Sequence, residues 1–359
     1  MSKEYAAAGV DPSLIKPFKQ LMRNVTERTR TFPQRRGVYV DTEGCYNYTG
    51  NQAHKWKQVT EGLGNKIEIA EIVYRTTGVA KFDSSALDTM RMAFNDAAAQ
   101  GAMPVTYTDE VAPANSPWFN DSIRAKSMAE GFYQGCEHDD VALVGGESPA
   151  LRFLVIDNPV MSGCVVGLIT PISRQIKNSE VVPGLVMVGV GANGLHSNGT
   201  SLVLDRGPKL SPDGLLSRMP NGEIFADAIL RPTPSYVRLV ERIQDAGITI
   251  VGIVPGTGGG VAKLMDAIPK EMTFRIRRWM GVPYVLQFMR ERFELGIRSC
   301  LTTFNWGVGY YLFVRPEDAE AVCKIGEDWG HPMAILGETV EGPMQVDFQP
   351  EKEVFTPEA

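Results

Sequence analysis

The amino-acid sequence predicts an α/β (or α+β) fold with two domains. The first observation is length, since 359 residues are enough for about two domains that each bury a core. The second is pattern, because short apolar runs alternate with amphipathic helical repeats along both halves. The third is the placement of glycines, which gather in loops where a predicted strand ends. We expect the chemistry to lie in a groove where these loops meet.

Composition excludes several classes of protein. A hydrophobic share of 43% and a charged share of 22% are typical of a globular chain, and a net charge of -6 argues against a nucleic-acid-binding surface. No apolar run approaches the roughly 18 residues of a membrane span, and the first residues lack the apolar core of a signal peptide. The cysteines contain no C-x-x-C pair, which predicts reduced thiols in a cytoplasmic protein, and the four dispersed histidines make a histidine-based metal centre improbable. The cysteines are Cys45, Cys136, Cys164, Cys300 and Cys323.

The first half divides into an N-terminal arm, residues 1–36, and a predicted domain, residues 37–172. Helical spacing runs from Leu14 to Val25 in the arm, and residues 37–48 alternate around Asp41–Gly44, which predicts a hairpin. Further strands are predicted over 104–111, 141–144 and 160–169, and further helices over 67–74, 82–100 and 125–136.

The second predicted domain spans residues 173–348, after a boundary near Pro171–Gly184. A helix is predicted to begin with Thr233 as its cap and Pro234 in its first position. Strands are predicted over 185–190, 248–254 and 310–314, and helices over 261–268 and 316–329, with Trp329 facing inward. The polar tail, residues 349–359, is expected to be loose.

The second half carries three glycine-rich stretches. In Val254–Val261, four of eight residues are glycine between an apolar run and a helical pattern, which predicts either a phosphate site or a tight turn. It is not a Walker A loop, because no Gly-Lys-Ser/Thr follows. Gly191–Gly199 places three consecutive polar side chains between glycines after a strand, which favours a binding loop over a polar turn. Thr302–Gly309 precedes an apolar strand.

The first half carries acidic groups beside glycines. Thr60–Lys66 combines backbone freedom, a carboxylate and a lysine, as phosphate binding beside a metal requires, although an exposed turn has the same composition. Gly145–Glu147 is predicted to be a loop at a strand end. On the helix 82–100, Asp88 and Asn95 fall within about 20° of each other, opposite the apolar face. They predict either oxygen ligands for a magnesium–nucleotide complex or a solvated acidic face.

Together these stretches resemble the phosphoribosylformylglycinamidine cyclo-ligase (aminoimidazole ribonucleotide synthetase) family over most of the chain. The matching motifs occur in the order of the family. They are Tyr5–Asp11, Thr60–Lys66, Leu87–Asp88, Phe94–Asp96, Gln100–Pro104, Gly145–Glu147, Gly194–Gly199, Pro232–Thr233, Thr257–Gly260 and Thr303–Gly309. Gly-Gly-Glu is shared with relatives such as selenophosphate synthetase and thiamine-monophosphate kinase, whereas the His-Ser-Asn-Gly and Thr-Phe-Asn-x-Gly-Val-Gly stretches are more specific to the cyclo-ligase.

The resemblance implies a two-domain PurM-like fold, a homodimer whose N-terminal strands form a barrel, and ATP-dependent ring closure of formylglycinamidine ribonucleotide. It implies Mg²⁺ held by Glu61, Asp88, Asp96 and Glu147. The ATP-binding set adds Gly62, Gly64, Lys66, Asn95, Gly145 and Gly146, with Lys66 on the phosphates. The ribonucleotide would contact His196, Ser197, Asn198, Gly199, Thr257, Gly258, Gly259, Gly260, Thr303 and Asn305. The implied catalytic residues are Asp96, His196 and Asn198, with either proton transfer or a hydrogen bond to substrate as the role of His196.

The sequence departs from the family at several positions, most of them in its front half. Glu61 stands where the family has aspartate, Asn65 replaces threonine, and Ser148–Arg152 replaces the usual Thr-Ala-Glu-Met-Pro-Gly. The histidine expected before Thr257 is replaced by Val254–Gly256. Two alternatives therefore stand beside the cyclo-ligase: another ATP-dependent member of the superfamily, such as a kinase or a selenophosphate-synthetase-like enzyme, and a nucleotide-binding relative without turnover.

Overall fold

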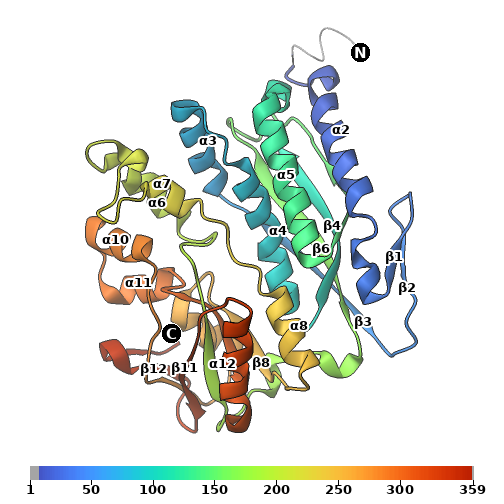
Figure 1. The fold of residues 1–359 in the computed structure, drawn as a ribbon. Helices are drawn as coiled ribbons and strands as arrows, with labels where there is room; N and C mark the ends of the chain where they lie inside the picture. Colours follow the sequence, from blue (N-terminus) through green and yellow to red (C-terminus); the bar gives the residue numbers. More distant parts are fainter. Residues whose placement is uncertain (1–7, 358–359) are drawn as a thin grey trace. The chain divides into compact units, whose positions relative to one another are not determined.

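The computed structural model of the protein describes residues 8–357 and shows two compact units (Figure 1). One unit comprises the chain up to Ala97 together with Ala102–Ile172, and the other comprises Ala98–Gly101 and the chain from Ser173 onward. Tyr5, the first residue of the predicted N-terminal motif, lies outside the described residues. The described residues form no helix that is long and apolar enough to cross a membrane.

The first unit is a four-stranded sheet with helices on one face. The strand order is β3-β6-β4-β5, and only the β4–β5 pair is parallel. Figure 1 shows α2, α4 and α5 on the same side of β4 and β6. The strands are β1 (Val38–Val40), β2 (Tyr46–Tyr48), β3 (Lys55–Gly62), β4 (Met103–Ala112), β5 (Ala142–Glu147) and β6 (Val160–Ile169). The helices are α2 (Pro12–Thr29), η1 (Phe32–Arg36), α3 (Lys66–Thr77), α4 (Phe82–Ala98), η2 (Ser116–Asn120), α5 (Ser122–Asp139) and η3 (Ile172–Arg174), the last of which crosses the unit boundary.

Aromatic packing fixes the helices on this sheet. Tyr107 of β4 is fully buried and its ring contacts Phe94 of α4 and Phe132 of α5, with centroid distances of 5.4 and 6.5 Å. Burying rings of this size contributes roughly 2 kcal/mol or more each. On the opposite face, Trp56 of β3 is 41% exposed, and Thr60 and Thr108 are also exposed. One face of the sheet is therefore covered by helices and the other is open to solvent.

The second unit contains a seven-stranded sheet among its described residues, in the order β13-β12-β9-β11-β7-β10-β8. Strand β10, which lies between β7 and β8, is buried along its whole length. The strands are β7 (Val186–Gly191), β8 (Gly252–Pro255), β9 (Thr273–Ile276), β10 (Val308–Val314), β11 (Met333–Val340), β12 (Gln345–Phe348) and β13 (Glu353–Phe355). The α-helices are α6 (Thr200–Arg206), α7 (Phe225–Ile229), α8 (Val237–Asp245), α9 (Lys263–Ala267), α10 (Tyr284–Arg292), α11 (Ile297–Thr303) and α12 (Ala319–Asp328). Short 3₁₀ turns are η4 (Asn178–Glu180), η5 (Gly207–Lys209), η6 (Gly214–Leu216), η7 (Gly260–Ala262), η8 (Pro316–Asp318) and η9 (Gln349–Glu351).

Most predicted elements are confirmed. The hairpin β1–β2 closes across Asp41, whose side chain accepts hydrogen bonds from the backbone of Glu43 and Cys45, both at 2.9 Å. The strand predicted over 160–169 has those bounds in the structure, and the helices predicted over 82–100 and 125–136 correspond to α4 and α5. The five cysteines are free thiols.

Four expectations are wrong. Helix α8 begins at Val237 without a side-chain cap, so Thr233 and Pro234 precede it, outside any helix or strand. The segment predicted to be a loose tail forms β13, because it pairs with β12 and buries Phe355. Trp329 is 45% exposed, since α12 ends one residue earlier and Arg242 covers its ring instead. Finally, Gly145–Glu147 is not a loop but the last half of β5, paired with Thr108–Glu110.

Candidate functional site

One row of the first unit's sheet brings two predicted motifs together. Register pairs Glu61 of β3 with Gly163 of β6, Gly163 with Asp109 of β4, and Asp109 with Gly146 of β5. Paired residues point to the same face, so the side chains of Glu61 and Asp109 flank Gly163, where a Cβ would lie 1.9 Å from the Tyr107 hydroxyl oxygen. The row therefore joins the Thr60–Lys66 and Gly-Gly-Glu stretches across four strands.

Gly146 is required by the Asp109 side chain. A Cβ at position 146 would lie 2.2 Å from Asp109 Oδ1, so no larger residue fits without displacing that carboxyl group. Asp109 is 6% exposed, and burial raises its pKa from 3.8 to about 7, with the nearby Glu147 charge adding to the effect. Sequence analysis overlooked Asp109, because only strand register places it opposite Gly146.

The buried Asp109 carboxyl predicts a pH dependence of stability. Between about pH 4 and pH 7 the folded chain holds a proton on Asp109 that the unfolded chain has lost, because the folded pKa is the higher one. The unfolding free energy supplied by this group therefore falls as pH rises through that window. In urea titrations, we expect the unfolding free energy of Asp109→Asn, measured relative to that of the parent, to rise by a few kcal/mol as the pH goes from 4.5 to 8. A difference that stays constant with pH would contradict this expectation, and exposed Asp328→Asn is the control.

Lys66 and Asp88 form a buried ion pair. The Lys66 Nζ atom lies 2.6 Å from Asp88 Oδ2, and both side chains are 0% exposed. Lys66 is the first residue of α3 and Asp88 lies in the middle of α4, so the pair joins the start of α3 to α4. Asn95 is also buried, while Asp96 is partly buried. The alternative of a solvated acidic face on α4 is therefore wrong for Asp88 and Asn95.

Residues 8–357 contain no group of three or more histidine, cysteine, aspartate or glutamate side chains that could hold a metal ion. The four predicted carboxylates Glu61, Asp88, Asp96 and Glu147 thus do not form a closed metal site. Magnesium at nucleotide sites needs only one or two carboxylates, because phosphate oxygens and water complete its octahedral shell. Partly buried Asp96 and exposed Glu147 fit that pattern, whereas Asp88 is neutralised by Lys66.

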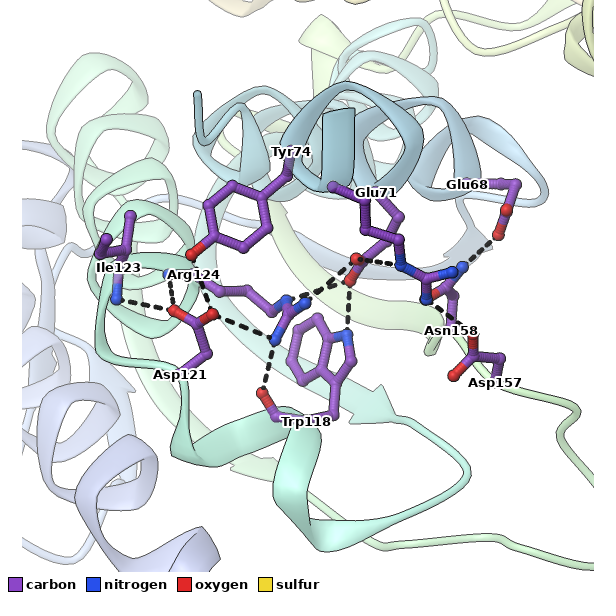
Figure 2. Close-up of polar contacts among 10 residues, drawn as sticks. Glu68, Glu71, Tyr74, Trp118, Asp121, Ile123, Arg124, Asp157 and Asn158 are labelled. Atoms are coloured by element: carbon purple, nitrogen blue, oxygen red, sulfur yellow. Dashed lines mark hydrogen bonds and ion pairs between the residues drawn. The ribbon is translucent and has the colours of Figure 1, made fainter. Parts of the chain in front are cut away.

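A buried glutamate anchors α3, the helix that begins at Lys66 (Figure 2). Glu71 is 0% exposed and accepts a hydrogen bond of 2.6 Å from the Trp118 indole Nε1. The Arg124 guanidinium of α5 lies 3.0 Å from the same carboxylate and also hydrogen-bonds the Trp118 carbonyl oxygen. Asp121 caps α5 through the backbone of Ile123 and Arg124 and accepts from Tyr74 at 2.8 Å. These contacts fix α3 against α5.

We expect Glu71→Gln to destabilise the protein by about 3 kcal/mol, because the Arg124 guanidinium loses its buried counter-charge. Urea unfolding followed by tryptophan fluorescence measures the change. Glu130→Gln is the matched control, since Glu130 lies on the exposed face of α5 and bonds only Gln134 among the contacts resolved for it. Equal stability of the two variants would show that the network around Glu71 does not anchor α3.

In the second unit, four neighbouring strands bring the predicted loops to one edge of the sheet. The carboxyl ends of β7 and β8 lie beside the amino ends of β10 and β11, because β10 runs antiparallel to both β7 and β8 and β11 runs antiparallel to β7. Backbone hydrogen bonds join the loops: Ala192 N to Gly307 O at 2.9 Å, and Gly256 N to Gly309 O at 2.7 Å. The stretches 191–199, 255–260 and 304–309 are therefore neighbours.

Asn305 holds this arrangement together. Its amide Nδ2 donates to the carbonyl oxygens of Gly194 at 2.9 Å and Leu195 at 3.2 Å, and its Oδ1 accepts from Gly307 N at 2.9 Å. The side chain is 2% exposed. Asn305 thus binds the neighbouring loop in this structure, and direct contact with a substrate stays a prediction. Thr303, the last residue of α11, is exposed.

Two bulky residues of these loops adopt left-handed backbone conformations. His196 has φ 60° and Trp306 has φ 46°, a region that costs a non-glycine residue about 1 kcal/mol or more. His196 is 1% exposed and its ring lies 6.5 Å from that of Tyr236, while Ser197 is also buried and Asn198 is partly exposed. Strain of this kind is retained where surrounding structure imposes it, which is common at binding sites.

The glycine stretch ends in a short helix rather than a long one. Gly258 and Gly259 are exposed with φ +69° and +95°, and the atom nearest to a Cβ at 258 would be Asn198 Oδ1, at 3.5 Å. Lys263 Nζ donates to Thr257 O at 2.7 Å and so links the start of α9 to the start of the glycine stretch. Helix α9 has only five residues, so its dipole contributes little to binding an anion. The features that suit an anion are the glycine backbone and the nearby Lys263 charge.

Comparison with known proteins decides the family. The family model described as "AIR synthase related protein, N-terminal domain" matches residues 42–169, and that described as "AIR synthase related protein, C-terminal domain" matches residues 182–348. These two ranges cover most of the chain. The chain belongs to the AIR synthase related family. Both ranges include the loops described above, with Glu61 to Glu147 in the first and His196 to Asn305 in the second.

Two curated relatives of this chain carry the same name. The phosphoribosylformylglycinamidine cyclo-ligase of Geobacillus thermodenitrificans is 29% identical over 351 residues, covering 95% of this chain and 97% of that one. The enzyme of the same name from Methanococcus vannielii is 29% identical over 297 residues, covering 82% and 80%.

Solved structures share the fold at lower identity. Thiamine-monophosphate kinase from Stenotrophomonas maltophilia has a TM-score of 0.65 at 15% identity, covering 91% of this chain and 96% of that one. Hydrogenase maturation protein HypE in complex with ATP has a TM-score of 0.62 at 15% identity, covering 95% and 94%. The predicted two-domain PurM-like fold is therefore confirmed.

Two residues at the second sheet edge were missed by sequence analysis. Tyr236 is buried, donates to Gly191 O at 2.9 Å, and fills the space left by Gly309, where a Cβ would lie 1.9 Å from its hydroxyl oxygen. Burial raises the pKa of Tyr236 above its ordinary 10.0, so it stays a neutral donor. Lys263 lies in an ordinary helical pattern. Neither position differs in sequence from a common core tyrosine or surface lysine.

Proposed function

We propose that this protein catalyses the ATP-dependent cyclisation of formylglycinamidine ribonucleotide to 5-aminoimidazole ribonucleotide, with release of ADP and phosphate. The observation that carries the proposal is the alignment with relatives named for this reaction over 95% of the chain. The geometry of the second unit agrees with it, since the two stretches that are more specific to the cyclo-ligase, 194–199 and 303–309, meet at one end of the sheet.

The chemistry needs activation before ring closure. The formyl oxygen is a poor leaving group, so its phosphorylation by ATP creates a carbon that an internal nitrogen can attack, and phosphate then leaves. The protein contributes positioning and charge stabilisation, as in other phosphoryl transfers. Both positioning and charge stabilisation require side chains that are held rigidly before the substrate binds. Buried Asn305 and the buried Lys66–Asp88 ion pair are held in this way.

The first unit is proposed to bind ATP and Mg²⁺. The exposed backbone of Gly62, Gly64 and Gly146 suits close approach of phosphates, and Asp96 and Glu147 are accessible enough to contact a phosphate-bound Mg²⁺. Glu61 and Asp109 flank Gly163 in the sheet and add acidic oxygens nearby. Bound Mg²⁺ would neutralise phosphate charge, and the side chains would orient it.

The second unit is proposed to bind the ribonucleotide. Its phosphate would lie on the glycines at 258–260, near Lys263, and Asn198 would contact the substrate from the adjacent loop. His196 lies at the same sheet edge, held in a left-handed conformation beside Tyr236. We assign it either a hydrogen bond to the substrate or a proton transfer at the reacting nitrogen.

A homodimer is also part of the proposal. The face of the four-stranded sheet opposite α4 and α5 exposes Trp56 and Thr60, and sheet faces of this kind are commonly covered by a partner. Light scattering on the purified protein measures the mass directly. The free cysteines support a reducing, cytoplasmic compartment.

One assay tests the activity. Purified protein with Mg²⁺, ATP and formylglycinamidine ribonucleotide is expected to release ADP and phosphate and to form the aminoimidazole product in equal amounts. Asp96→Ala is expected to lower turnover by on the order of 100-fold or more while leaving the fold intact, as judged by circular dichroism. ATP consumption only with another acceptor would favour a kinase-like enzyme, and nucleotide binding without turnover would favour a regulatory relative. Full activity of Asp96→Ala would remove that residue from the site.

A further inference from the structure

A segment without regular structure, residues 277–283, connects β9 to α10 and is fixed at both ends. At its start, the backbone N–H groups of Arg277 and Arg278 both donate to Leu336 O, at 2.8 and 3.1 Å. Beyond its end, Val285 of α10 is buried in the core of the second unit. The course of the 277–283 segment is therefore set by the fold on both sides.

The 277–283 segment lies against glycines of the two loops that Asn305 joins. A Cβ added to Gly307 would lie 2.7 Å from the Gly281 carbonyl oxygen. One added to Gly191 would lie 3.3 Å from Met280 Cε. Gly307 also has φ +104°, which a residue with a side chain rarely adopts. Because these glycines carry no side chain, the segment packs directly on the loop backbone, at the end of the sheet where the ribonucleotide is proposed to bind.

Trp279 connects the segment to the turn that contains Asn305. Its indole Nε1 donates to the carbonyl oxygen of Trp306 at 2.9 Å. Trp306 directly follows Asn305 and has the left-handed φ of 46°. The Trp279 ring packs on the rings of Phe348 and Tyr311, with centroid distances of 4.9 and 6.3 Å. The donor is therefore held in place by the sheet before it reaches the turn.

One peptide unit carries this contact further. The unit whose oxygen accepts from Trp279 also supplies the N–H of Gly307, which donates to Asn305 Oδ1 at 2.9 Å. The other end of the Asn305 amide donates to the carbonyl oxygens of Gly194 and Leu195. Fixing the peptide unit fixes the plane of the Asn305 amide, because a hydrogen bond weakens steeply when its angle is lost. A chain of hydrogen bonds therefore runs from Trp279 to the neighbouring loop.

We propose that Trp279 is a positioning residue of the ribonucleotide site, which orients Asn305 and the loops beside it without touching the substrate. This inference rests on the proposed function, which assigns the ribonucleotide to the second unit. Side chains that hold the groups around a ligand decide how exactly those groups are placed. Their loss therefore weakens binding even though no ligand contact is removed.

Trp279→Phe tests the hydrogen bond, because phenylalanine keeps an aromatic ring at this position and lacks the N–H donor. Phe348→Leu is the matched control, since it removes the neighbouring ring and leaves the Trp279 donor in place. Trp329→Phe, the same chemical change at a tryptophan that is 45% exposed, is the second control. Circular dichroism checks that each variant is folded, and urea titration measures its stability.

Hydrogen exchange measures the positioning without any substrate. In mass spectrometry, we expect the backbone amides of 304–309 and 191–195 to exchange on the order of tenfold faster in Trp279→Phe than in the parent. In steady-state kinetics, this variant is expected to raise KM for formylglycinamidine ribonucleotide on the order of tenfold and to leave KM for ATP unchanged. Both controls are expected to stay within about twofold of the parent in exchange and in KM. A merely structural role would lower the urea midpoint without moving KM.

The outcomes separate this inference from the proposed function. Exchange at 304–309 as slow as in the parent would overturn the inference, whatever the activity. Faster exchange with an unchanged KM for the ribonucleotide would overturn it too, as would an equal rise of KM in Phe348→Leu, which would assign the effect to packing. If the parent neither binds nor converts the ribonucleotide, the proposed function fails and the site role with it, whereas the exchange result still decides whether Trp279 holds the turn.

Discussion

Lys66→Met is expected to lower the unfolding free energy by about 3–5 kcal/mol and to abolish ATP turnover. The variant leaves the Asp88 carboxylate at 0% exposure without the ammonium that lies 2.6 Å away. A buried charge deprived of its partner is far more costly than the pair is stabilising, because both groups have already lost their hydration. Urea denaturation measures the first effect, and ADP release in the cyclisation assay measures the second.

The double variant Lys66→Met/Asp88→Leu distinguishes structure from function. Replacing both charges with apolar groups of similar size removes the unpaired charge, so most of the lost stability should return. Turnover should stay absent, because the proposed phosphate contact of Lys66 is gone. Retained turnover in the double variant would exclude the pair from the nucleotide site. If the double variant were as unstable as Lys66→Met, then Lys66 and Asp88 would not be each other's main partners.

Asn305→Ala is expected to raise KM for the ribonucleotide by at least about tenfold and to cost about 3 kcal/mol of stability. The substitution leaves the carbonyl groups of Gly194 and Leu195 and the N–H of Gly307 without the buried partner that joins their loops. Affinity for ATP should be unchanged, because the proposed nucleotide site lies in the other unit. Steady-state kinetics and calorimetry with an ATP analogue measure the two quantities.

Asn221→Ala is the control for this prediction. Asn221 lies in an exposed turn of the same unit, where its side chain accepts a hydrogen bond from Glu223 N at 3.1 Å. We expect its kinetic constants to match those of the parent. If Asn305→Ala raised KM for ATP instead, the assignment of ribonucleotide and ATP to the two units would be wrong.

Local sequence predicted the elements whose signals are local. The hairpin at 37–48 followed from alternation around Asp41–Gly44, and α4 and α5 followed from apolar repeats at helical spacing. Elements that depend on a distant partner were less predictable. Residues 353–355 look like a polar tail, yet they form β13 because β12 offers unpaired backbone groups and a place for Phe355.

The same distinction applies to the candidate site. Glycine loops, polar side chains and family motifs predicted His196, Thr257–Gly260 and Asn305 as candidate site residues without any structure. Periodicity predicted that Asp88 faces away from the apolar stripe of α4, but it could not show that Lys66 covers it. Asp109 was invisible for a related reason, since only strand register places it beside Gly146 and away from water.

By itself, the sequence determined the two-domain α/β class, the family and the stretches that are candidates for the chemistry, because all of these depend on composition, local periodicity and motif order. Only the tertiary structure decided which polar groups are buried, which are paired and which remain available to a ligand. The motif predicts Asn305 as a substrate contact, whereas in the structure its side chain anchors the neighbouring loop. The apolar residues at 153–156 resemble a core segment in sequence and lie in solvent. The physical reason is that burial and pairing depend on residues far apart in the chain, which no local pattern specifies.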